Sequence, residues 1–425
     1  MGSRGSVGVI SGSQYIKAGD SASIDAFGRW RTSEPQTIFD AKNIFDDDGL
    51  ASNVENVPLF FDNAETSGSG TSTSYRADEA SQRLSVGATT AGTRVRQSLQ
   101  RFNYQPGKSQ QIFSTFNFIS LDDNITKRAG YFDANDGLFL QSVGSTVSFV
   151  TRTSTSGSPV DNTIAQSSWN VDKFDGTGPS GITLDFTKTQ ILCIDFEWLG
   201  VGRVRMGFVV DGIIYSAHEF LNANNLSIVY MKTPNLPIRW EISNDGSGAA
   251  SNLDTICTSV ISEGGSEDLG TVRYAATTTH VDANSAGTTY AVIGMRLKTE
   301  YLGETVKLLK ASLIEVQGSK DLEWSVKWNP TVASTFTYAD ETNSAVQIAR
   351  GATANTVTNG IDIGGGFFNS GQGNSGGNIS SGIASALNLG SKIDGTVDEI
   401  VLCVKPLTGS TNTDVWGSLT WRELT

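Results

Sequence analysis

The stretch CIDFEWLGVGRVRMGFVVDGIIYSAHEF, residues 193–220, decides the fold because it holds three short apolar runs separated by two turn signals. Asp211 and Gly212, between two apolar runs, form a strong hairpin signal, since Asp and Gly tolerate the positive φ angles of a tight two-residue turn. The Gly-Val-Gly sequence at 200–202 supplies another tight turn. The stretch therefore predicts a meander of three antiparallel strands: one that ends at Leu199, one over 203–210 and one from Ile213 onward.

The first of these strands has two different faces, because successive side chains of a strand point to opposite sides. One face carries Cys193, Asp195 and Glu197. The other face is apolar and is expected to pack into a core; it carries Ile194, Phe196 and Trp198. Two carboxylates on one face are also the raw material of an acid/base site, so the strand is either catalytic or structural.

Strand-like runs continue on both sides of this stretch, for example QIFSTFNFIS and TTYAVIGMRLK, with Gly, Asn, Asp, Ser and Pro between them. Helical periodicity is scarce, and SYRADEASQRL offers a turn or two at most. This regular punctuation predicts an all-β protein, an antiparallel β-sandwich or jelly roll.

The length of 425 residues predicts two domains, because a single core stops growing at roughly 250–300 residues. Residues 1–30 are rich in Gly and Ser and predict an extended N-terminal arm. Residues 31–318 are assigned to the β-sandwich, with LLKASLIEVQ (308–317) as its last strand. Residues 319–425 are assigned to a smaller C-terminal β domain, which contains a Gly/Asn/Ser-rich loop.

Charge and hydropathy exclude several classes of function. The chain has 31 Lys+Arg against 44 Asp+Glu, a net charge of −13, which repels phosphate backbones and anionic lipid alike. We therefore expect no nucleic-acid partner. Because the chain lacks a run of eighteen apolar residues and the apolar segment of a signal peptide, we also expect no membrane insertion and no secretion signal.

The cysteines and histidines argue against a metal or a cofactor. Cys193, Cys257 and Cys403 lie in apolar or β-branched runs without a CxxC or Cys/His cluster, which predicts unpaired thiols that fill the core. His218 and His280 are the two histidines of the chain, too few for a typical zinc site or a His-based triad. We expect no cofactor and no metal.

The meander and its VDG turn at 210–212 resemble the concanavalin-A-like fold, in which lectins, laminin-type binding modules and glucanases share two curved antiparallel sheets. The resemblance covers about half of the chain and implies a jelly-roll sandwich. Retaining β-glucanases of this fold carry a strand motif Glu-x-Asp-x-Glu, with nucleophile, assisting Asp and acid/base in that order. CIDFEWLG is similar to it: Asp195 falls on the assisting Asp, Glu197 on the acid/base, and Cys193 on the nucleophile.

The missing carboxylate leaves three interpretations of this strand. Retaining hydrolysis needs two carboxyl groups about 5–5.5 Å apart, so Cys193 argues against a glucanase, and we expect no catalytic residues. Asp195 and Glu197 then face solvent on a half-buried sheet, with Arg203 or Arg205 as cross-strand partner, or line a groove that binds sugar without cutting it. The two carboxylates are the candidate ligand-binding residues.

Three segments resemble virion structural proteins of tailed bacteriophages. They are DAFGRWRTSEPQTIFDAKNIFDDDGL (25–50), NPTVASTFTYADETNSAVQIARG (329–351) and IDGTVDEIVLCVKPLTGSTNTDVWGSLTWREL (393–424). The resemblance implies a tail fibre, spike or capsid decoration subunit, made in the bacterial cytoplasm and located in the virion. It also implies other virion proteins as partners, a homo-oligomer such as a trimer, and a host-surface glycan as ligand.

The sequence hypothesis is therefore a non-enzymatic structural component of a phage particle, with a polysaccharide depolymerase as the alternative. Phe27, Arg29, Trp30 and Arg31 are the candidate assembly anchor, because Trp and Arg are enriched at interface hot spots. The alternative for this cluster is a strand that packs onto its own domain.

Overall fold

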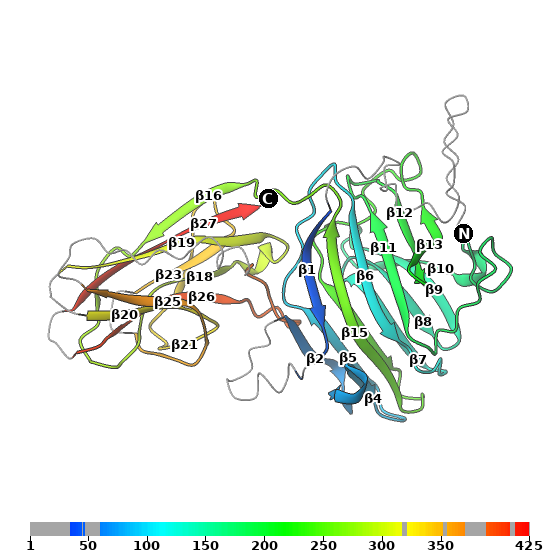
Figure 1. Cartoon of the computed structure of the whole chain (residues 1–425), viewed down its shortest axis with the longest axis horizontal. Coiled ribbons are helices and arrows are strands. Elements are labelled where there is room, and N and C mark those ends of the chain that lie inside the picture. The colour runs from blue at the N-terminus through cyan, green and yellow to red at the C-terminus, as the bar shows by residue number, and fades with distance from the viewer. Residues whose placement is uncertain are drawn as a thin grey trace. The chain divides into compact units, whose positions relative to one another are not determined.

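The computed structural model describes residues 35–44, 46, 60–316, 321–351, 355–369, 388–408 and 413–424. This part of the chain is almost entirely β, as predicted (Figure 1). Its helices are short 3-10 turns: η2 (Ala77–Glu79), η3 (Gln166–Ser168) and η4 (Thr299–Tyr301). Among these residues, no helix has the length and apolar character needed to cross a membrane. The predicted arm, residues 1–30, lies outside the described residues.

The first of two compact units contains residues 60–98 and 102–267 together with the described residues up to 46. It is an antiparallel sandwich of an eight-stranded and a seven-stranded sheet. The larger sheet has the order β13-β12-β11-β6-β15-β4-β3, and β1 also pairs with β15. Its strands are β1 (Gln36–Lys42), β3 (Thr71–Arg76), β4 (Ser81–Val86), β6 (Gln110–Asn117), β11 (Gln190–Phe196), β12 (Val204–Val210), β13 (Ile213–Phe220) and β15 (Ser251–Ser262).

The other sheet of the sandwich has the order β10-β9-β8-β7-β14-β5-β2. Its strands are β2 (Phe61–Gly68), β5 (Gly92–Ser98), β7 (Ile125–Phe132), β8 (Gly137–Val143), β9 (Thr146–Thr153), β10 (Val160–Ala165) and β14 (Ile238–Asn244). The two-sheet antiparallel architecture confirms the predicted fold class, a concanavalin-A-like sandwich.

The predicted meander is confirmed as β11, β12 and β13, which lie side by side at one end of the larger sheet (Figure 1). Asp211 has φ 50° and Gly212 has φ 78°, the paired positive values that a two-residue hairpin turn requires. This turn aligns β12 against β13, and the turn at 198–202 aligns β11 against β12.

The apolar face of β11 lies in the core between the sheets. Ile194 and Phe196 are both 0% exposed. The Phe196 ring has its centroid 5.7 Å from that of Tyr104 and 5.5 Å from that of Tyr131, which belongs to the opposite sheet. Trp198 is half-buried against the same core, and its indole Nε1 donates to the carbonyl of Met231 at 3.0 Å. The predicted core face of this strand is therefore confirmed.

The second unit contains residues 99–101 and the described residues from 268 onward. Its larger sheet has the order β22-β23-β18-β26-β20-β25, and in the other sheet β27 pairs with β16, β17 and β19. These strands, with the separate pair β21 and β24, are β16 (Thr271–Ala276), β17 (Val281–Asp282), β18 (Tyr290–Leu297), β19 (Thr305–Glu315), β20 (Asp321–Trp328), β21 (Thr331–Val332), β22 (Tyr338–Asp340), β23 (Val346–Arg350), β24 (Val357–Thr358), β25 (Ile361–Asn369), β26 (Glu399–Pro406) and β27 (Asp414–Leu424). The described residues of this unit are again arranged in antiparallel sheets.

The division between the units lies at Glu267 and Asp268, earlier than the boundary at 318 and 319 placed from sequence. Strand β19, predicted as the last strand of the sandwich, pairs with β27 from Thr305 opposite Leu424 to Glu315 opposite Val415. Its hydrogen-bonding partner is thus the last strand of the chain. A local apolar pattern shows that a strand exists, but it does not show which distant strand pairs with it.

The three cysteines lie on three different strands. Cys193 is on β11, Cys257 on β15 and Cys403 on β26. Cys403 is 0% exposed, and burial raises the pKa of its thiol to about 12. The position of Cys403 among Ala291, Ala349 and other buried apolar side chains agrees with its predicted role as an apolar filler.

Replacement of Phe196 by Ala is expected to lower the free energy of unfolding by about 3–5 kcal/mol, because it leaves a cavity between two aromatic rings of the core. Ile213→Ala, on the same meander but 46% exposed, is the control and is expected to cost less than about 1 kcal/mol. Urea denaturation followed by far-UV circular dichroism measures both. Equal losses for the two variants would contradict the assignment of Phe196 to the core.

Candidate functional site

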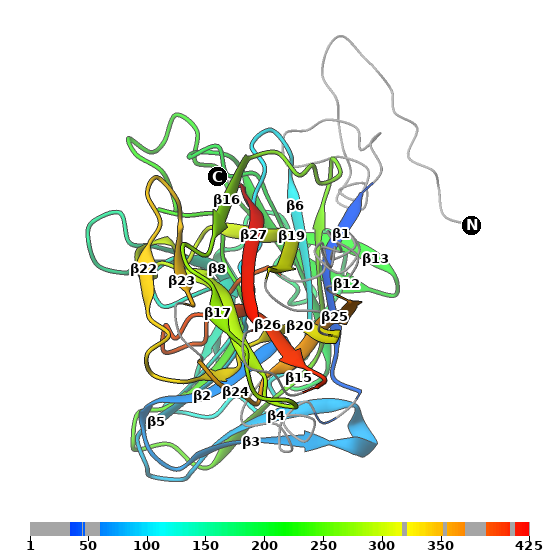
Figure 2. The same ribbon diagram turned by 90° about the vertical axis from the view of Figure 1, so that its left-hand side faces the viewer.

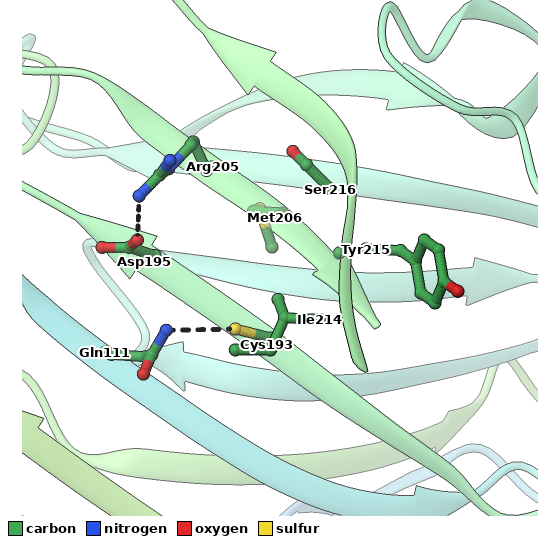
Figure 3. Close-up of a pocket in the computed structure, with 9 residues that line it drawn as sticks. Gln111, Cys193, Asp195, Arg205, Met206, Ile214, Tyr215 and Ser216 are labelled. Atoms are coloured by element: carbon green, nitrogen blue, oxygen red, sulfur yellow. Dashed lines mark hydrogen bonds and ion pairs between the residues drawn. The ribbon is translucent and has the colours of Figure 1, made fainter. Parts of the chain in front are cut away.

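Asp195 lies in the middle of the polar face of β11, between two neighbouring strands. The register places it opposite Gln111 of β6 on one side and Arg205 of β12 on the other. Arg205 Nη2 donates to Asp195 Oδ2, and the two residues are 7% and 4% exposed. Figure 3 shows this pair on the sheet face. Asp195 is therefore one half of a buried ion pair.

This burial corrects the expectation that Asp195 faces solvent. Arg205 is the partner that the sequence offered, but the long side chains on adjacent strands stand beside the carboxylate and exclude water from it. Cys193, two residues earlier on the same face, is 3% exposed and accepts a weak hydrogen bond from Gln111 Nε2 at 3.8 Å.

A shallow hollow lies on this face where β12 and β13 approach each other closely. A Cβ on Gly207 would lie 2.0 Å from the carbonyl oxygen of Tyr215, so this position requires glycine. A β-bulge beside Gly207 also shifts the register of β13. The hollow contains about 250 Å³ of space, counting the solvent at its mouth. Its lining residues are Gln111, Cys193, Asp195, Arg205, Met206, Gly207, Ile214, Tyr215 and Ser216 (Figure 3).

Ser216 adds a polar group that the described protein leaves unused. Its hydroxyl oxygen is buried and has no hydrogen-bond partner among the described residues. Buried hydroxyls are nearly always hydrogen-bonded, so a hydroxyl of this kind in the lining of a hollow is suited to pair with a ligand or an ordered water. Sequence patterns do not single out Ser216, because its place in the hollow depends on the bulge in β13.

Glu197 lies near the hollow in sequence but is not among its lining residues. It is 7% exposed, and its carboxylate Oε1 accepts the backbone N–H of Arg203 at 3.1 Å. The backbone of Glu197 accepts a hydrogen bond from the Tyr230 hydroxyl at 2.8 Å. Burial, with the charge of Glu197 nearby, raises the pKa of Tyr230 well above its usual value and keeps that donor protonated. Glu197 therefore closes the turn between β11 and β12, and its expected exposure is corrected as well.

The described residues that line the hollow do not include a pair of carboxylates for acid/base chemistry. Among the described residues that line the hollow, Asp195 is the one carboxylate, and Arg205 holds it in an ion pair. Glycoside hydrolysis needs a second carboxyl group across the scissile bond, and Cys193 occupies the position where the glucanase motif has it. The face offers hydrogen-bonding groups instead: an amide, a hydroxyl and a neutralised ion pair.

The candidate anchor residues, Phe27, Arg29, Trp30 and Arg31, lie outside the described residues. The hollow also contains residues that sequence reasoning missed. Gln111 comes from β6, far from the meander in sequence, so only the strand order β12-β11-β6 brings it next to Asp195.

Comparisons of the chain with known proteins find similarity to solved structures alone. No protein-family model matches it, and no curated protein matches it. Its fold is similar to a glycosyl hydrolase family 16 protein from Mycobacterium smegmatis (9% identity, TM-score 0.35, covering 53% of this chain and 100% of that one). It is also similar to a family 16 enzyme from Bacteroides ovatus solved with a glucan product (9%, 0.34, 52% and 99%) and to the Emp47p carbohydrate recognition domain (10%, 0.30, 54% and 98%). Similarities this remote transfer no activity and no ligand to this chain.

Asp195→Ala is expected to lower the free energy of unfolding by about 3–5 kcal/mol, because it leaves the Arg205 guanidinium buried without its carboxylate. The double change Asp195→Leu with Arg205→Met removes both charges and is expected to recover most of that loss.

Asp78→Ala, at an exposed aspartate of η2, is the control and is expected to change stability by less than about 0.5 kcal/mol. Chemical denaturation of the four proteins measures these effects. If the double variant is no more stable than Asp195→Ala, the unpaired Arg205 guanidinium is not the cause of the loss of unfolding free energy in Asp195→Ala.

Proposed function

We propose that the protein is a non-enzymatic binding module whose sandwich holds a carbohydrate on the polar face of β11 and β12. The observation that carries the proposal is that the hollow combines one carboxylate, already neutralised by Arg205, with the unused hydroxyl of Ser216. Such a face can hydrogen-bond sugar hydroxyls but lacks the second carboxylate that would cut a glycosidic bond.

The ligand that suits this face is a neutral sugar segment. Because the charges of Asp195 and Arg205 neutralise each other, the face offers a ligand neither an unpaired cation nor an unpaired anion there. Gln111 and Ser216 supply directional hydrogen bonds, and Ile214 supplies apolar surface for the carbon face of a sugar ring. The hollow is too small for a whole sugar ring, so it would accept a single hydroxyl or another group of that size, with the rest of the glycan lying over the sheet.

We further propose that the module serves as a surface component of a tailed-phage particle, assembled as a homo-oligomer with other virion proteins. Support comes from the resemblance of residues 25–50, 329–351 and 393–424 to virion structural proteins. The dense β structure of the two units also suits a protein that must withstand exposure on a particle. Nothing in the structural neighbours bears on this assignment.

Carbohydrate binding is tested with a panel of neutral bacterial surface polysaccharides immobilised on biosensors. We expect saturable binding to at least one of them without release of reducing sugar. Ser216→Ala is expected to weaken that binding about fivefold, the loss of one net hydrogen bond, whereas Ser158→Ala on an exposed loop leaves it unchanged. Absence of binding across the panel would overturn the ligand class, and reducing-sugar release by the wild type would overturn the non-enzymatic assignment.

The virion assignment has its own test, independent of any glycan. Antibodies against the purified chain are expected to label intact phage particles in electron micrographs, and peptides of the chain are expected in the proteome of gradient-purified particles. A chain found only in the soluble fraction of lysed cells would refute the assignment and leave the binding proposal standing.

A further inference from the structure

A second cluster of chemistry-bearing side chains lies in the second unit, where β17 pairs with the start of β27. The strands are antiparallel and place Asp282 directly opposite Asp414. Val281 and Val415, the neighbouring pair in the register, are 0% exposed and anchor the two strands in the core. Figure 2 shows β27 beside β16 and β17. This packing holds the two carboxylates together.

His280 completes the cluster. Its Nε2 lies 3.4 Å from Asp282 Oδ1 and 3.8 Å from Asp414 Oδ1, and one ligand atom from each of the three residues lies within 4.8 Å of the others. Tetrahedral zinc with bonds of about 2.0–2.2 Å needs donor atoms about 3.3–3.6 Å apart. Adjustments of about 1 Å or less would therefore bring one imidazole nitrogen and two carboxylate oxygens to that spacing.

The charges at this place are unbalanced. Like charges directly opposite each other on antiparallel strands destabilise the pairing, and Asp282 and Asp414 are such a pair. Among the described residues, no Lys or Arg forms an ion pair with either carboxylate. A cation bound between the two carboxylates would remove their mutual repulsion.

Asp414 is the strongest single indication of a ligand. Its side chain is 12% exposed, and among the described residues no hydrogen-bond donor reaches its carboxylate. Its one charged contact is His280 Nε2, at 3.8 Å. A buried carboxylate is normally paired or coordinates a metal. The carboxylate is directed toward the same place as His280 and Asp282, which are about half exposed and leave that place open to solvent.

We propose that His280, Asp282 and Asp414 form a binding site for a divalent cation of the zinc class. Imidazole nitrogen with carboxylate oxygen suits Zn²⁺ and related transition metals, whereas Ca²⁺ and Mg²⁺ prefer oxygen ligands alone. Three protein ligands leave a coordination position for water or for a group of a partner molecule. By neutralising the opposed carboxylates, the cation stabilises the pairing of β17 with β27.

The test uses the full-length chain without a histidine tag, stripped with EDTA and titrated with ZnCl₂ by isothermal calorimetry. We expect one equivalent of Zn²⁺ to bind and the thermal unfolding midpoint to rise with it. His280→Ala, Asp282→Asn and Asp414→Asn are each expected to weaken binding at least tenfold and to abolish the thermal shift. Asp340→Asn, at an exposed aspartate of β22 in the same unit, is the matched control and is expected to bind like the wild type.

Two further outcomes decide the proposal. In metal-free buffer, Asp282→Asn is expected to unfold at a temperature equal to or above that of the wild type, because it removes the carboxylate repulsion, so a loss of binding in a variant that folds this well supports a ligand role. Absence of saturable Zn²⁺ binding, or wild-type affinity in His280→Ala, would overturn the site. Binding of CaCl₂ in place of ZnCl₂ at these residues would overturn the assigned metal class.

Discussion

The buried ion pair between Asp195 and Arg205 fixes the alignment of the strands that make up the polar face of the first unit. A slip of one residue in β11 would turn Asp195 into the core and bring Ile194 and Phe196 out of it, because side chains alternate with a period of two. It would also leave a buried charge without its partner, which costs several kcal/mol. The hairpin turns on either side of β12 limit the register locally. The ion pair and the apolar face raise the free energy of any shifted register of β11. The hollow beside Gly207 exists only in this register.

The elements that sequence predicts well are those whose signal is local. The Asp211-Gly212 turn, the three strands of the meander and the core positions of Ile194 and Phe196 all follow from residues close together in the chain. The pairing of Asp195 with Arg205 is predictable for the same reason, since one short turn separates their strands. Burial of that pair is not predictable in this way, because it depends on β6, which supplies Gln111 from far away in sequence.

The same limit explains the division between the units and the second site. Strand β19 reads locally as another sandwich strand, yet its backbone hydrogen bonds go to β27 at the end of the chain. His280 and Asp282 are two residues apart, and that spacing on a strand is a visible hint of two ligands on one face. Asp414 joins them only through the pairing of β17 with β27. The expectation of no metal rested on the number of histidines in the sequence, which does not reveal this pairing.

The net charge of the chain does not indicate which ligand either site suits. The ion pairs of the individual carboxylates do. In the first unit the acidic groups on the sheet faces meet arginines: Asp161 lies 2.7 Å from Arg152, and Glu241 lies 2.5 Å from Arg128 and 2.6 Å from Arg239. Burial by itself raises the pKa of Glu241, but the two arginines outweigh it and the pKa is lowered.

A sheet face neutralised in this way attracts a ligand through hydrogen bonds and shape and not through charge, which favours sugars over ions. At β17 and β27 the situation is reversed, since two carboxylates face each other and a single imidazole is their nearest basic group. The net charge of −13 therefore does not distinguish carboxylates that arginines pair within the fold from Asp282 and Asp414, which have no Lys or Arg partner among the described residues.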